Sequence, residues 1–169
     1  MDWLSGNGVV IDGSKPNWSW RQDGGALAVS RSYGEALILS DLGAASDLCL
    51  ELDAASEEAQ VVRAYSLPRY DGLFWFELTG VESSNCLAKV CGVDLRSRSF
   101  PDGGVAQTFV AGLSAIVVRA DLGSTLSFHL LGDSASAGYF WDCMIDAMEE
   151  FGGRPVGLSS LQALGAEVE

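Results

Sequence analysis

Strand-like segments in the second part of this sequence follow one another closely, and this arrangement limits the fold more than any other feature. Residues 60–67 and 73–79 are separated only by the turn 68–72. Strands joined by so few residues pair antiparallel, because a parallel pair needs a crossover of a dozen or more residues. The remaining segments are a helix over 82–90, strands over 105–111, 114–119 and 125–131, and a helix over 133–151. We therefore expect an α+β fold, with a largely antiparallel sheet and helices packed on one of its faces.

The clearest strand pattern is that of residues 73–79. Its residues are strong β formers, and its side chains alternate between two faces. Phe74, Phe76 and Leu78 share one face, whereas Trp75 lies on the other. The pattern predicts a strand with an apolar face that packs on the core.

The last helix has an equally clear pattern. Asp133 or Ser134 can cap its start, and Gly152-Gly153 ends it. Apolar residues recur at the three- and four-residue spacing of one helix face, at Phe140, Met144, Met148 and Phe151. This stripe predicts that the helix covers the sheet.

The first part of the chain is less regular. Residues 25–29 and 35–39 are expected to form short strands, and residues 41–59 a helix. Residues 1–24 show no periodicity, although they hold three of the five tryptophans. The sequence therefore predicts an N-terminal tail over 1–24, a single α+β domain over 25–152 and a C-terminal tail over 153–169.

The charge balance excludes two classes of partner. The formal net charge is −13 and the isoelectric point about 4.2, with no run of basic residues. Such a chain repels both a phosphate backbone and an anionic membrane surface. No apolar stretch of 18 residues and no export signal are visible, so we expect a cytoplasmic protein that binds neither nucleic acid nor membrane.

The four cysteines are expected to be free thiols. Without an export signal, a disulfide framework is improbable in a chain of this length. Cys86 and Cys91 are five positions apart and only His129 could join them, whereas structural zinc sites use two tighter pairs. We therefore predict no metal site.

Catalytic signatures are also missing. The sequence has no G-x-G-x-x-G, no phosphate-binding loop and no G-x-S-x-G. His129 is the single histidine, and it could serve as a general base only if the fold brought a nucleophile to it. We predict no catalytic, cofactor-binding or metal-binding residue in this chain.

An ordered set of short motifs spans residues 86–152. Cys91-Gly92-Val93-Asp94-Leu95 is followed by Phe100-Pro101, by Ala106-Gln107-Thr108 and by an aromatic helix that ends in Glu150-Phe151. The set resembles the gamma subunit of heterotetrameric sarcosine oxidase, and is similar to the related small subunit of N-methylglutamate dehydrogenase. Gly92 stands where that family usually has proline.

The resemblance implies a fold like one domain of the folate-binding aminomethyltransferases. It also implies a non-catalytic, structural subunit of a complex that oxidatively demethylates sarcosine or a similar N-methyl amino acid. Its partners would be larger flavoprotein subunits of the alpha and beta type. FAD, FMN, NAD and tetrahydrofolate would belong to the complex and none of them to this chain.

One departure from the folate enzymes bears on this expectation. Those enzymes carry a catalytic acid in a glycine-rich loop between two strands, and the matching residues here, 111–115, contain no carboxylate. This difference argues against folate chemistry in the chain itself.

Tryptophans are the candidate partner contacts, because aromatic residues often anchor one protein on another. For Trp75 and Trp141, packing within the domain is the alternative, and Trp3, Trp18 and Trp20 could dock on this domain instead of on a partner. The candidates are Trp3, Trp18, Trp20, Trp75 and Trp141.

Three functions are therefore compared. The first is the structural subunit of an oxidoreductase complex. The second is a free-standing domain that binds a small, folate-like molecule, and the third is a small enzyme that uses His129.

Overall fold

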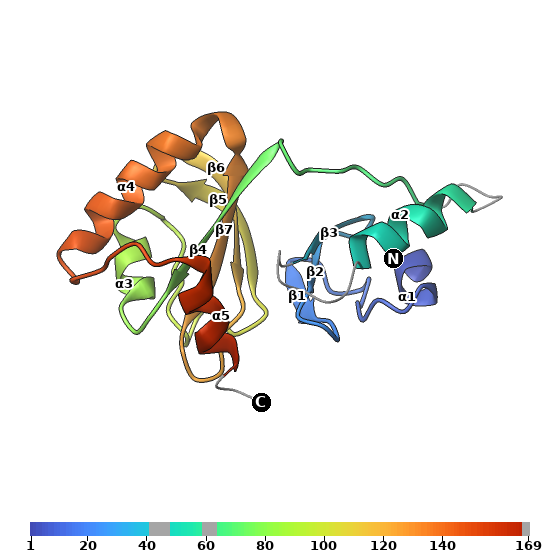
Figure 1. Cartoon of the computed structure of the whole chain (residues 1–169). Helices are drawn as coiled ribbons and strands as arrows, with labels where there is room; N and C mark the ends of the chain where they lie inside the picture. Colours follow the sequence, from blue (N-terminus) through green and yellow to red (C-terminus); the bar gives the residue numbers. More distant parts are fainter. Residues whose placement is uncertain (41–47, 59–63, 167–169) are drawn as a thin grey trace. The chain divides into compact units, whose positions relative to one another are not determined.

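The computed structural model describes residues 1–40, 48–58 and 64–166 (Figure 1). The chain divides into two compact units, Met1–Arg69 and Tyr70–Glu169. This division differs from the single domain expected over 25–152. Residues 64–67, the end of the strand expected over 60–67, lie close to the division and have no regular structure.

The second unit is built on a four-stranded sheet. Its strands follow the spatial order β4-β7-β6-β5, and every neighbouring pair is antiparallel. The strands are β4 (Leu73–Thr79), β5 (Val105–Val110), β6 (Leu113–Arg119) and β7 (Ser127–Asp133). The helices are α3 (Ser83–Ala88), α4 (Ala137–Glu149) after the short 3-10 helix η1 (Ser134–Ser136), and α5 (Leu158–Ala166).

The apolar stripe of α4 packs on the apolar face of β4 in the core of this unit. Phe140 of α4 is fully buried, with its ring 4.6 Å from that of Phe74 and 6.1 Å from that of Phe76. Leu130 of β7, the register partner of Phe76, belongs to the same cluster. Helices α3 and α4 lie on the same side of the sheet (Figure 1). The α+β class and the antiparallel sheet are thus confirmed.

Gly132 of β7 leaves the space that the ring of Phe74 occupies. A Cβ atom at Gly132 would lie 2.5 and 2.7 Å from two ring carbons of Phe74. Phe74 is itself stacked on Phe76 and packs at a tilt on Phe140, so its ring cannot move away toward either of them. We expect Gly132→Ala to lower the free energy of unfolding by about 1–3 kcal/mol, because it overpacks the core. Urea unfolding would measure this change.

Gly138 provides a matched control for that substitution. It lies near the start of α4, and a Cβ there would meet no atom within 4 Å. Gly138→Ala should leave stability unchanged or raise it by up to about 1 kcal/mol, since alanine favours helix. Equal destabilisation by both substitutions would contradict the packing explanation.

The first unit contains a three-stranded antiparallel sheet in the order β1-β2-β3. Its strands are β1 (Trp18–Arg21), β2 (Leu27–Ser32) and β3 (Glu35–Leu39), and its helices are α1 (Asp2–Gly6) and α2 (Leu48–Glu58). The two expected short strands are confirmed as β2 and β3. The expected start of the long helix, residues 41–47, lies outside the described residues, as do residues 60–63 of the expected strand over 60–67.

The prediction of an N-terminal tail over 1–24 is wrong. Strand β1 pairs with β2, with Trp20 opposite Ala28. The side-chain amide of Gln22 accepts a hydrogen bond from the Val10 backbone N–H at 2.8 Å and donates one to the Val10 carbonyl at 2.9 Å. The contact between Gln22 and Val10 spans 12 positions, and a four-residue strand is too short to show a period. The C-terminal tail is likewise interrupted by α5.

Candidate functional site

The Val-Asp-Leu motif lies in the loop after α3, and its aspartate is the centre of a hydrogen-bond network. The carboxylate of Asp94 accepts hydrogen bonds from Nε and Nη2 of Arg96 at 2.7 and 2.8 Å, and from the Ser99 hydroxyl at 2.8 Å. The next residue, Leu95, is buried in the core of the unit. Asp94 therefore orders the loop that carries Leu95 inward.

These hydrogen bonds make the loop sensitive to acid. Bonds from Arg96 and then Ser99 hold the pKa of Asp94 well below its usual range. A carboxyl with a lowered folded-state pKa stabilises the fold above its unfolded pKa of about 3.9, and this contribution is lost as the pH falls toward the folded value. Asp94→Asn should therefore lower the urea midpoint near pH 7, and the difference from the unmodified chain should narrow below about pH 4.

Asp71 is the control for this titration. Within the described part of the chain, its carboxylate forms no hydrogen bond or ion pair, and it is exposed. Asp71→Asn should leave the urea midpoint the same at both pH values. A pH-independent loss in Asp94→Asn would show that the carboxylate charge is not what orders the loop.

A second buried network surrounds Arg119 at the end of β6. Its guanidinium binds Asp121 through Nε at 2.9 Å and Nη2 at 2.6 Å, and donates from Nη1 to the Phe100 carbonyl at 2.6 Å. Gly104 lies near this network, and a larger residue would not fit there, because a Cβ at position 104 would lie 2.9 Å from the Pro101 carbonyl oxygen. The motif residues Phe100 and Pro101, together with Gly104, thus support the fold.

His129 lies on the sheet face opposite α4. The indole Nε1–H of Trp75 donates to Nδ1 of His129 at 3.0 Å, and Glu77 Oε2 lies 4.0 Å from the same nitrogen. The Ser127 hydroxyl donates to Glu77 Oε1 at 2.6 Å, so this serine is directed to the carboxylate and away from the imidazole. Nδ1 of His129 is therefore engaged by the Trp75 indole. The arrangement resembles a satisfied polar network more than a nucleophile with its base.

A two-residue turn joins β5 to β6. It consists of Ala111 and Gly112, both with positive φ, at 51° and 78°. Such a pair forms a tight two-residue hairpin, which leaves no room for a longer loop. The Ala111 backbone is held on both sides: its N–H donates to the Val90 carbonyl, and its carbonyl accepts from the Tyr139 hydroxyl at 3.3 Å.

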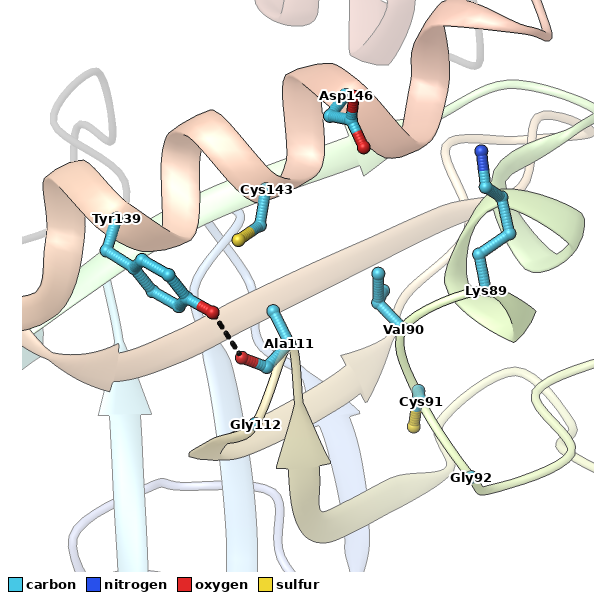
Figure 2. A pocket seen from close by; sticks show the side chains of 9 residues that line it. All are labelled: Lys89, Val90, Cys91, Gly92, Ala111, Gly112, Tyr139, Cys143 and Asp146. Atoms are coloured by element: carbon cyan, nitrogen blue, oxygen red, sulfur yellow. Dashed lines mark hydrogen bonds between the residues drawn. The ribbon is translucent and has the colours of Figure 1, made fainter.

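An open hollow of about 580 Å³ lies between this turn, the end of α3 and helix α4. Figure 2 shows Tyr139, Cys143 and Asp146 along one side of α4, facing the turn and the chain near Lys89. The remaining lining residues are Val90, Cys91, Gly92, Ala111 and Gly112.

The residues around the hollow were missed in the sequence. Tyr139, Cys143 and Asp146 are spaced by four and three positions, which places them on one helix face. That spacing was visible, but the opposite wall comes from residues 89–92 and 111–112, far away in the chain. Only the packing of α3 and the β5–β6 hairpin brings the two walls together.

The five tryptophans lie in different surroundings. Trp75 and Trp141 are each 39% exposed, and Trp141 also packs on Phe76 with ring centroids 5.3 Å apart. Trp3 packs against the small core of the first unit, and Lys15 Nζ lies 3.2 Å from the ring centroid of Trp18. Trp20 is half-buried in β1. Their role as partner contacts stays a prediction.

The cysteines and acidic groups form no metal cluster in the part of the chain that the structure describes. Cys86, Cys91 and Cys143 are free thiols, and burial raises the pKa of the Cys86 thiol. Among the described helices, none is long and apolar enough to cross a membrane.

Comparison with known proteins places this geometry in context. The family of the GCVT N-terminal domain matches residues 44–169. No curated protein matches the sequence significantly. Among solved structures, the chain is similar to a chain of the heterotetrameric sarcosine oxidase from Corynebacterium sp. U-96 in complex with pyrrole 2-carboxylate. The TM-score is 0.72 at 20% identity, and the match covers 91% of this chain and 74% of that one. At this identity the likeness establishes a shared fold.

Proposed function

Because the chain belongs to the family of the GCVT N-terminal domain, we propose that it is a non-catalytic, gamma-type subunit of a flavin-dependent amine oxidase or dehydrogenase complex. The complex would oxidatively demethylate sarcosine or a similar N-methyl amino acid. The observation that carries the proposal is the shared fold, over most of this chain, with a chain of an enzyme that is itself a heterotetramer.

The roles of the motif residues support a structural function. Asp94 orders a loop, Arg119 holds two loops together, and His129 is engaged by Trp75. The turn at Ala111 and Gly112 carries no carboxylate that could transfer a proton. These residues stabilise the unit, and none of them forms a set of nucleophile, base and oxyanion donors.

The proposal assigns the chemistry to other chains. Larger flavoprotein subunits of alpha and beta type would hold FAD, FMN and NAD, and tetrahydrofolate would accept the one-carbon unit there. This chain would contribute a docking surface, with its five tryptophans as candidate contacts. We also place the complex in the cytoplasm.

Purification from the source organism tests this function. We expect the tagged full-length chain to retain larger chains and to give a yellow sample with flavin absorption. The isolated chain should show no turnover of sarcosine or N-methylglutamate, whereas the retained assembly should oxidise one of them. A colourless, monomeric chain that retains no flavoprotein would refute the proposal.

A free-standing binder of a folate-like molecule is the second candidate. The hollow beside α4 favours it, because its volume of about 580 Å³ lies within the range of small-molecule sites. A ligand at 100 times its dissociation constant would add about 2.7 kcal/mol to the unfolding free energy. The melting temperature in tetrahydrofolate and its derivatives measures this directly, and no shift is expected if the chain is a structural subunit.

A further inference from the structure

Asn7 and Gly8, where α1 of the first unit ends, form a residue pair that is prone to spontaneous deamidation. In that reaction the backbone nitrogen of the following residue attacks Cγ of the asparagine, and glycine hinders the attack least because it has no side chain. The chain has three asparagines, Asn7, Asn17 and Asn85, and only Asn7 precedes a glycine. Both residues of the pair are exposed, and a Cβ at Gly8 would meet no atom within 4 Å. Solvent therefore reaches the reacting atoms.

The folded conformation of the pair opposes the attack. The Gly8 N–H must lose its proton before the nitrogen can attack, and it donates a hydrogen bond to the Ser5 carbonyl at 3.2 Å. The side-chain amide of Asn7 donates to the Trp3 carbonyl at 2.8 Å, which fixes its direction. At the Asn7 ψ of 24°, the Gly8 nitrogen nearly eclipses the backbone nitrogen of Asn7 and lies away from the side chain. Deamidation therefore requires the last turn of α1 to open.

The opening of this turn is a local event. Helix α1 spans only five residues, and a helix of that length is not stable by itself. Among the described residues, none supplies a side-chain cap to its start, and none of its own residues is buried. Trp3 and Leu4 are its anchors, because they pack against the small cluster around Val9. A segment with so few buried contacts opens at a lower free energy than the whole unit.

We infer that Asn7 is a spontaneous deamidation site whose rate is limited by the opening of α1. In the open turn, the Gly8 nitrogen forms a bond to Cγ of Asn7, and the bond between Cγ and Nδ2 breaks. Ammonia leaves with the proton from the Gly8 nitrogen, and a cyclic succinimide remains. Water then opens the succinimide at one of its two carbonyls, which gives aspartate or isoaspartate.

The product no longer fits the end of α1. A carboxylate at position 7 cannot donate to the Trp3 carbonyl. It also places a negative charge at the C-terminal end of the helix, where the macrodipole disfavours it. Isoaspartate adds a methylene group to the backbone as well. Each product weakens the turn that slows the reaction, so the modification loosens the anchoring of Trp3 in the first unit.

Deamidation of the full-length chain at mildly alkaline pH, in buffer and in unfolding urea, tests the inference. Peptides prepared in acid, where the reaction stops, are sequenced by tandem mass spectrometry. In urea, we expect Asn7 to deamidate faster than Asn17 and Asn85, because only Asn7 precedes a glycine. In buffer, Asn7 should react more slowly than in urea by about tenfold or more. Equal rates at Asn7 in the two samples, or a faster reaction at either of the other asparagines in urea, would overturn the inference.

Trp3→Ala tests whether α1 is the barrier. It removes the anchoring ring and leaves Asn7 and Gly8 in place, so Asn7 should react about fivefold faster in buffer. Tyr33→Ala is the matched control, because Tyr33 is 73% exposed in the turn between β2 and β3. Its rate should stay within about twofold of that of the original chain.

The melting temperature of each variant shows whether it is folded in buffer. If Trp3→Ala is not, Trp3→Phe takes its place, since it shortens the anchor without removing it, and a smaller acceleration in the same direction is expected. A folded Trp3 variant that deamidates at the rate of Tyr33→Ala would refute the role of α1.

Discussion

Phe140→Ala is expected to lower the free energy of unfolding of the second unit by about 3–5 kcal/mol, because it leaves a large cavity in a closed core. Phe140 is fully buried under α4 and packs on Phe74 and Phe76. It is the point at which the helix stripe meets the sheet. A loss of this size approaches the whole stability of a small domain.

Urea unfolding followed by far-ultraviolet circular dichroism measures this effect. Tyr139→Ala, one position earlier on the same helix, is the control, because its side chain is 58% exposed. It should cost less than about 1 kcal/mol. Similar losses for the two variants would contradict the placement of α4, since they would mean that the helix packs on the sheet through a different face.

Asp121→Ala should be nearly as damaging, with an expected loss of about 3–5 kcal/mol. The side chain of Arg119 is only 8% exposed, and Asp121 supplies both oxygens that bind its Nε and Nη2. Without Asp121, a guanidinium remains buried with the Phe100 carbonyl as a hydrogen-bond acceptor. An unpaired buried charge costs far more than an exposed ion pair gains.

A double variant separates the charge effect from lost packing. Arg119→Met with Asp121→Ala removes the charge together with its partner, so it should be less destabilised than Asp121→Ala alone. Glu35→Ala, which breaks the exposed pair between Arg31 and Glu35, should cost at most about 1 kcal/mol. The double variant could instead lose as much unfolding free energy as Arg119→Met and Asp121→Ala lose together when each is measured alone. That result would refute a penalty from a buried, unpaired charge.

Local periodicity accounts for the elements that were predicted well. Residues 73–79 alternate between faces, and β4 has those bounds. The stripe through Phe140 and Met144 predicts α4, and both residues are buried. In such segments, the same side chains that set the period also bury the apolar area, so pattern and packing agree.

Hydrogen bonds outside the periodic segments account for the errors. Residues 1–24 were expected to form a tail, but Gln22 binds the Val10 backbone and β1 pairs with β2. Arg119 showed no sign of burial in the sequence, because the Phe100 carbonyl and Asp121 that satisfy it come from two loops. Long-range hydrogen bonds leave no period in the chain.

The sequence by itself determined the α+β class, the antiparallel pairing of close strands, the face of α4 that is buried and the absence of familiar catalytic motifs. Each of these depends on neighbours within a few residues. Only the tertiary structure decided that the motif residues Asp94 and Phe100 support loops, and that Tyr139 and Asp146 face the Ala111–Gly112 turn across a hollow. The physical reason is that a surface is assembled from segments whose spacing in the chain carries no information about their distance in space.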